Sequence, residues 1–221
     1  MARACRVTLV LILTRAIALR ILTFGDSLTA GVERAFAPLT PYGNTLEQRL
    51  ATAVDGGATV VVSGVPLESA HAMPARLARV LASEPPFDCA IILGGTNDIW
   101  SRDVARIWAS LSCMYGAVLD ASPRLGVVTL PPFSPAPLRW LGAVAATDAA
   151  RRELNARIRD FAAEDDRAFV VDLAALCDEA PPRTSMGLDD GIHLSPAGYR
   201  ALGDEAFAAL SRSMGVFEDQ A

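Results

Sequence analysis

Two short segments, near opposite ends of the chain, contain the residue types of nucleophilic catalysis. Ser27 ends the apolar run in "ILTFGDSLTAG", and His193 lies in "DDGIHLS" with Asp190 three residues before it. A serine hydroxyl attacks an ester only when a base of near-neutral pKa accepts its proton, and histidine is the usual base. A carboxylate that binds one imidazole nitrogen leaves the other nitrogen facing the hydroxyl. The three residues therefore predict a serine hydrolase in which Asp190 orients His193.

Each of these residues also has a purely structural interpretation. Ser27 is a good turn residue and helix N-cap, and Asp26 beside it is expected to hold the turn. His193 can cap the helix that follows it, although this role does not explain the acid pair at 189–190. His71 lies among small and apolar residues with no acid placed to orient it. We expect His71 to be a packing or surface residue.

A third polar segment contains a candidate for stabilising negative charge in the transition state. Asn97 follows Gly94-Gly95-Thr96 directly after an apolar run. Its amide can donate to a developing oxyanion together with the backbone N–H of Ser27, and the alternative is an ordinary polar turn. The sequence contains no Gly-x-Ser-x-Gly, no Gly-x-Gly-x-x-Gly and no P-loop. Their absence argues against a nucleophile elbow and against the usual nucleotide sites.

Short apolar strands that alternate with longer segments of helical period must position these residues. The expected strands are Leu19–Phe24, Thr59–Ser63, Cys89–Leu93, Leu125–Leu130 and Ala168–Asp172. The expected helices are Asn44–Val54, Ser69–Ala82, Asp103–Leu119, Asp148–Ala163 and Ser195–Arg212. Nearly continuous apolar strands are typical of parallel sheets covered on both faces, so this α/β alternation predicts an open five-stranded parallel sheet between helical layers.

Helix starts have their own signals. Asn44 followed by Glu47 has the capping-box pattern, and Ser195-Pro196 is an N-cap with proline at the first helical position. Pro74 falls early in the second expected helix, which is therefore expected to begin near it.

The carboxyl ends of parallel strands share one edge of the sheet, where ligands bind. The segments 25–27, 63–69 and 94–98 follow the first three strands, and 189–193 precedes the last helix. We expect all four to converge on one site.

Composition limits the class of protein. The chain has 221 residues, 52% hydrophobic and 20% charged, which fits one globular domain. Its formal net charge of -5 argues against nucleic-acid binding, and no apolar run is long enough for a membrane helix. The four cysteines have no metal-ligand or disulfide spacing, so we expect no metal site.

We expect the domain to span residues 19–214, between an N-terminal extension (1–18) and a C-terminal tail (215–221). The extension has an arginine-flanked apolar stretch and an Ala-x-Ala motif at 16–18, as in a secretory signal. A cytoplasmic enzyme with a ragged N-terminus is an equal alternative, and an organelle transit peptide is a third. The sequence does not predict the oligomeric state.

The motifs "GDSLTAG", "LGGTND" and "DDGIHLSPAGY", in this order, resemble the SGNH (GDSL) hydrolase family. The resemblance implies a flavodoxin-like three-layer α/β/α sandwich and a serine esterase that needs no cofactor. It also implies Ser27 as nucleophile, His193 as base, Asp190 as its partner and Asn97 as an oxyanion donor. Asp189 is the fallback acid.

The sequence departs from the family pattern after the second strand. In "VVVSGVPLESA", Val62 stands where the family usually has asparagine, and Leu67 stands where it has the glycine that supplies a third oxyanion N–H. Leucine can supply the same N–H if the local backbone tolerates a Cβ. If that position needs a positive φ, we expect the loop to shift and Gly64 to become the alternative donor.

The expected substrates are small acyl or aryl esters, including lysophospholipids and thioesters. Phe133 and Trp140, in the proline-rich segment 131–145, and Trp100 are expected to line the substrate pocket, unless that segment only packs on the sheet. The alternatives are a carbohydrate O-deacetylase, an acyltransferase, or a catalytically impaired binding module.

Overall fold

A computed structural model describes residues 18–33, 38–133, 144–179, 186 and 190–215, and its centre is a sheet of five parallel strands. The strands are β1 (Leu19–Gly25), β2 (Ala58–Gly64), β3 (Cys89–Leu93), β4 (Arg124–Val128) and β5 (Ala168–Val171). Their order in the sheet is β2-β1-β3-β4-β5, and every neighbouring pair is parallel. The predicted parallel sheet is confirmed, with each strand boundary within two residues of its expected position.

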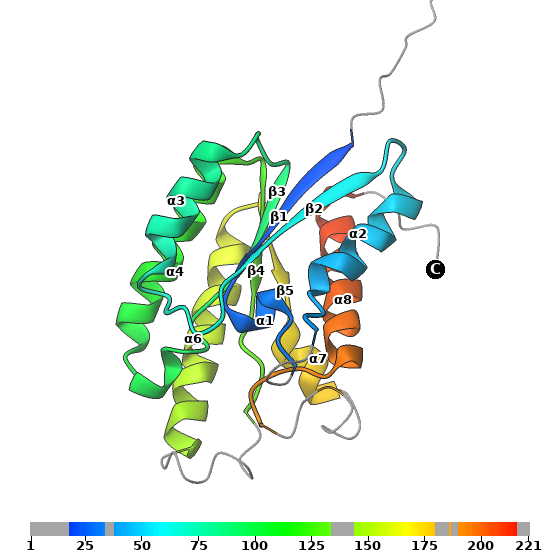
Figure 1. Ribbon diagram of the computed structural model, residues 1–221. Helices are drawn as coiled ribbons and strands as arrows, with labels where there is room; N and C mark the ends of the chain where they lie inside the picture. Colours follow the sequence, from blue (N-terminus) through cyan, green and yellow to red (C-terminus); the bar gives the residue numbers. More distant parts are fainter. Residues whose placement is uncertain (1–17, 34–37, 134–143, 180–185, 187–189, 216–221) are drawn as a thin grey trace, which may run out of the picture.

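Two layers of helices cover the sheet (Figure 1). The helices α3 (Met73–Ser83), α4 (Val104–Ala121) and α6 (Val144–Glu164) cover one face, while α2 (Tyr42–Ala53) and α8 (Pro196–Met214) cover the other. Alternate strand residues such as Leu22 and Ile21 belong to two separate buried clusters, one under each layer. All five residues of β3, the central strand, are buried, as expected for a strand covered on both faces. The three-layer α/β/α architecture is confirmed.

Of the two helix N-caps predicted from the sequence, one is confirmed and one is wrong. Ser195 caps α8, because its Oγ accepts a hydrogen bond from the Gly198 N–H at 3.0 Å. The capping box predicted at Asn44 is wrong: α2 begins at Tyr42, and Glu47 Oε1 instead accepts a hydrogen bond from the Val60 N–H at 3.2 Å. Val60 lies in the edge strand β2, so the Glu47 carboxylate accepts a hydrogen bond from a strand and not from the start of its own helix.

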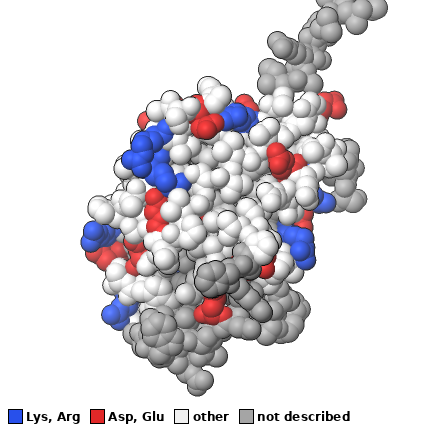
Figure 2. Space-filling view, viewed as in Figure 1, with Lys and Arg blue, Asp and Glu red and all other residues white. Residues whose placement is uncertain are grey.

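Three short elements add to the predicted set. They are α1 (Ser27–Ala30), the 3₁₀ helix η1 (Ile99–Ser101) and α7 (Leu173–Glu179). Each directly follows the carboxyl end of a strand or its loop, at the edge of the sheet where the polar segments converge. Within the described residues, no helix is long and apolar enough to cross a membrane. On the face shown in Figure 2, the described arginines are interspersed with acidic side chains and form no continuous basic surface.

Candidate active site

The chain turns sharply between β1 and α1, and Ser27 is the first residue of this short helix. Asp26 is the N-cap: its Oδ1 accepts a hydrogen bond from the Leu28 N–H at 2.9 Å, which confirms its expected role in the turn. Gly25 and Gly64 end the two neighbouring strands beneath α1. A Cβ on Gly25 would lie 2.3 Å from Thr29 Oγ1 in α1, and one on Gly64 would lie 2.2 Å from the backbone N of Ala30. Only glycine lets the helix sit this close to the sheet.

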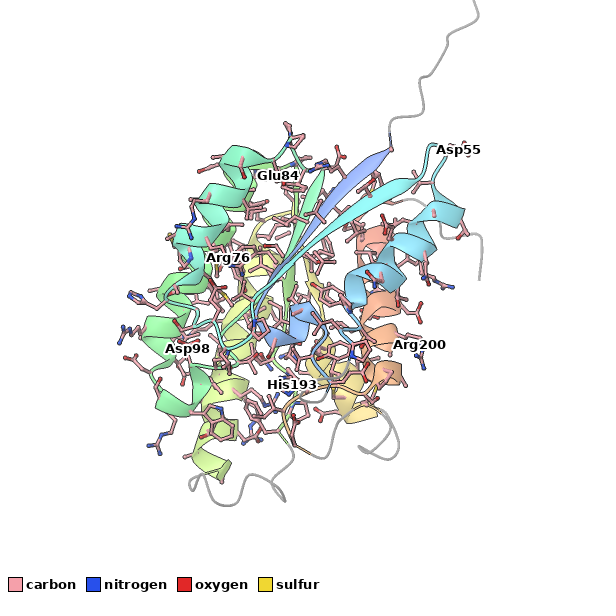
Figure 3. The ribbon with its side chains drawn as sticks, in the orientation of Figure 1. Asp55, Arg76, Glu84, Asp98, His193 and Arg200 are labelled. Carbon is pink, nitrogen blue, oxygen red and sulfur yellow. The ribbon has the colours of Figure 1, made fainter. Side chains whose placement is uncertain are left out.

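Ser27, His193 and Asp190 form a continuous line of hydrogen bonds. His193 Nε2 lies 3.0 Å from Ser27 Oγ, and His193 Nδ1 lies 2.6 Å from Asp190 Oδ2. Ser27 and His193 are 166 positions apart in the sequence, and the segment before α8 brings the imidazole next to α1 (Figure 3). The arrangement has the geometry of a nucleophile, a base and an orienting acid.

The Asp190 carboxylate accepts hydrogen bonds from the backbone of the residues that follow it. Its Oδ1 accepts hydrogen bonds from the N–H groups of Ile192 (2.9 Å) and His193 (3.0 Å). Partial burial raises the pKa of Asp190, but the hydrogen bonds from the His193 side chain and these two N–H groups outweigh it, so the pKa lies below its usual value. Asp190 is therefore ionised at neutral pH and accepts the Nδ1–H of His193.

Asp26 has the opposite electrostatic environment. Its side chain is completely buried, and this burial raises its pKa to about 6, against the lowering effects of the Leu28 N–H, the nearby Thr96 hydroxyl and His193. One oxygen of this carboxyl group accepts from the helix, and the other has no hydrogen-bond partner among the residues that the structure describes, which adds to the cost of ionising it.

Asn97 connects the loop after β3 to the loop after β2. Its Nδ2 donates to the backbone oxygen of Glu68 at 2.9 Å, and the neighbouring Asp98 accepts a hydrogen bond from the Ala70 N–H at 2.7 Å. An amide nitrogen has two N–H groups, and only one of those of Asn97 is used in this contact. The other makes no hydrogen bond to the residues that the structure describes.

Leu67 lies in the turn that departs from the family pattern. The Glu68 N–H bonds to Val65 O at 3.2 Å, so Pro66 and Leu67 are the central turn residues, and Leu67 has a φ of 64°. This conformation costs a leucine about 1–2 kcal/mol compared with its preferred backbone regions. A positive φ was expected to shift the loop and make Gly64 the alternative donor, but Leu67 adopts the positive φ itself, and Gly64 ends β2 against α1. The Leu67 side chain is 86% exposed, so it contributes almost no packing.

The sequence profile of the GDSL-like lipase/acylhydrolase family matches residues 23–201, which includes all of these segments. The chain belongs to this family.

Several solved structures of GDSL-type and related esterases are similar in fold to this chain. The native aryl esterase of M. smegmatis is 27% identical to this chain, with a TM-score of 0.66 over 89% of this chain and 99% of its own. A lipase/acylhydrolase from Enterococcus faecalis is 23% identical, with a TM-score of 0.70 over 92% and 100%. A carbohydrate acetylesterase family member from Sinorhizobium meliloti is 19% identical, with a TM-score of 0.69 over 90% and 100%. No curated protein sequence matches the chain. The GDSL-like chain is a hydrolase of ester bonds.

Two of the three aromatic residues predicted to line the pocket of this GDSL-like hydrolase are in contact. The rings of Trp100 and Phe133 have centroids 4.8 Å apart and planes tilted by 40°. Phe133 also lines a cavity of about 830 Å³ between α6 and α7, together with Pro132 and polar residues that include Arg151. Trp140 lies outside the described residues, as does Asp189.

The part of the chain that the structure describes contains no candidate metal site. No three His, Cys, Asp or Glu side chains are grouped there so that they could bind an ion. Cys89, Cys113 and Cys177 form no disulfide with one another, and His71 is exposed, as its sequence context suggested.

Sequence reasoning did not identify the charged pair behind the Leu67 turn. Arg76 and Glu68 form an ion pair with side chains that are only 14% and 11% exposed. An arginine and a glutamate eight positions apart look like ordinary surface charges in the sequence, and no motif indicates that they are buried.

Proposed function

We propose that the chain is a serine esterase in which Ser27 is the nucleophile, His193 the general base and Asp190 the residue that orients His193. The observation behind this proposal is the hydrogen-bonded line from Ser27 Oγ to Nε2 and from Nδ1 to Asp190. His193 takes the Ser27 proton as Oγ attacks the ester carbonyl, and then gives it to the leaving alcohol. Water hydrolyses the acyl-enzyme by the reverse sequence.

Three donors are proposed to stabilise the oxyanion. They are the backbone N–H of Ser27, the second N–H of the Asn97 amide and the backbone N–H of Leu67. The contact between Asn97 and Glu68 O supports this set, because it ties the amide donor to the residue next to Leu67. Each such donor typically contributes about 10²–10³ in kcat.

Small acyl or aryl esters are the proposed substrates. The contact between the Trp100 and Phe133 rings supports an apolar or aromatic acyl group, because the partly buried Trp100 follows the loop that contains Asn97 and packs on the buried Phe133. The 27% identity to a protein named as an aryl esterase supports the same substrate class.

The test combines covalent labelling with turnover. The parent protein should form a single fluorophosphonate adduct, on the Ser27 peptide, and should hydrolyse nitrophenyl esters with a preference for one acyl length. Ser27→Ala should lose both the adduct and the turnover. Ser83→Ala is the matched control, because Ser83 is exposed near the end of α3 and far from the site. Turnover retained by Ser27→Ala would contradict the proposal.

A further inference from the structure

The guanidinium group of Arg76 lies beneath the Leu67 turn. Arg76 comes from α3, its side chain is only 14% exposed, and its Cζ lies 3.8 Å from the centroid of the Phe24 ring in β1. Figure 3 shows Arg76 between the helix layer and the sheet. A buried cation needs partners for its charge and for its N–H groups.

Three separate segments supply these partners. Nε lies 2.9 Å from both carboxylate oxygens of Glu68, and Nη2 donates to Glu68 Oε2 at 2.5 Å. Nη1 donates to the backbone oxygen of Ser63 at 3.1 Å and to its Oγ at 2.6 Å, and Nη2 also donates to Gly25 O at 2.8 Å. These contacts use all five N–H groups of the guanidinium. Arg76 thus joins the ends of β1 and β2 to the turn after β2.

The turn needs such an anchor because its own residues do not stabilise it. Leu67 has an unfavourable positive φ and an exposed side chain. A leucine that is free to relax moves to negative φ, which reorients the adjacent peptide units and the N–H of Leu67. Glu68, the next residue, is fixed by Arg76 through its carboxylate and by Asn97 through its backbone oxygen.

We propose that Arg76 is a positioning residue for the oxyanion donors. It touches no reacting atom. Through Glu68 it keeps Leu67 at positive φ with the N–H toward the oxyanion, and through Gly25 O it fixes the end of β1 directly before the turn that presents Ser27. This inference rests on the proposed function, since it assigns Arg76 a role in the same site.

Replacement by lysine separates charge from geometry. Lysine keeps the positive charge but presents a single ammonium, which cannot bridge the three segments in one plane. With nitrophenyl acetate, Arg76→Lys should lower kcat about 10- to 100-fold, part of the effect of losing one donor outright. KM should stay within about threefold, because the lost interaction forms only in the transition state. Arg79→Lys, an exposed position on the same helix, should behave as the parent.

A double-mutant cycle with Leu67→Gly tests the mechanism. Glycine adopts positive φ about as readily as negative φ, so the turn then depends less on its anchor. Arg76→Lys should cost less than about threefold in kcat in the Leu67→Gly background, and the two substitutions should be strongly non-additive. Equal costs in both backgrounds would overturn the proposal.

A thiono ester, in which sulfur replaces the carbonyl oxygen, provides a readout that general loosening of the fold would not change. Sulfur accepts hydrogen bonds weakly, so the oxyanion donors assist this substrate less. Arg76→Lys should therefore slow the oxygen ester at least several-fold more than its thiono analogue, as expected when only oxyanion stabilisation is lost. An equal loss with both substrates would indicate a structural role and overturn the proposal.

Two further measurements keep the result interpretable. If Arg76→Lys does not fold, Glu68→Gln replaces it in both tests, because it keeps the size and one acceptor of the carboxylate and should lower kcat several-fold in the same selective way. Fluorophosphonate labelling of Ser27 in the parent separates the two proposals. A parent that labels and turns over, with Arg76 variants that match it, overturns only this inference, whereas a parent that neither labels nor turns over contradicts the proposed function itself.

Discussion

At the scale of single residues, the proposed catalytic line depends on the state of one carboxylate. The pKa of Asp190 is lowered because its oxygens accept hydrogen bonds from His193 and from two backbone N–H groups, which together outweigh its partial burial. The ionised carboxylate accepts from Nδ1, and this contact selects the imidazole tautomer whose Nε2 can take the Ser27 proton. The spacing of Asp190 and His193 in the sequence was enough to predict this pair.

Asp190→Asn should remove that tautomer control. If the asparagine oxygen keeps the two backbone contacts, its NH₂ group faces Nδ1 and places the imidazole proton on Nε2, toward Ser27. We expect kcat to fall about 10³- to 10⁴-fold with little change in KM, measured with nitrophenyl esters at neutral pH. Asp189→Asn is the control, and a larger loss for it than for Asp190→Asn would reverse the choice of acid.

At the scale of elements, the sequence predicted the strands better than the helix starts. An apolar run bounded by polar segments has one interpretation in a parallel sheet, so β3 was predicted at Cys89–Leu93 without error. The capping box at Asn44 failed because Glu47 has a partner outside its helix, the N–H of an edge strand. Local patterns predict an element only where no tertiary contact competes for the same side chain.

The confirmed cap at Ser195 and the wrongly predicted cap at Asn44 should differ in their effect on stability. Ser195→Ala removes a real N-cap and should lower the free energy of unfolding by about 1 kcal/mol. Asn44→Ala removes an exposed side chain that caps nothing and should change it by less than about 0.5 kcal/mol. Urea unfolding of both variants measures the difference, and equal effects would mean that Asn44 stabilises α2 after all.

At the scale of the whole molecule, the parallel sheet explains why the convergence of these loops could be predicted from the sequence. The contacts of Arg76 that hold the Leu67 turn could not be predicted. The loops after β1, β2 and β3 meet because their strands end at one edge of the sheet, so Ser27, Asn97 and the Leu67 turn could be expected together. The partners of Arg76 lie 8, 13 and 51 positions away and include backbone oxygens. No sequence pattern specifies such contacts, because they depend on how closely α3 packs on the sheet.

The stability of the whole molecule should depend on pH through Asp26. Burial raises the pKa of this carboxyl from 3.8 to about 6 in the folded protein. Between these two pH values the folded state therefore binds more protons than the unfolded chain, and the free energy of unfolding falls as the pH rises. A shift of about two pKa units corresponds to about 3 kcal/mol, lost between about pH 4 and pH 6.

Asp26→Asn should abolish this loss, because an asparagine does not titrate and its oxygen can still accept from the Leu28 N–H. From about pH 4 to pH 7, urea unfolding should show the variant gaining about 3 kcal/mol relative to the parent. The exposed Asp55, at the opposite end of the sheet (Figure 3), is the control, and Asp55→Asn should follow the parent at every pH. Parallel curves for Asp26→Asn and the parent would show that Asp26 is ionised in the folded protein throughout this range. The Asp26 cap would then be a carboxylate, and the site would contain a buried negative charge in addition to the partly exposed Asp190.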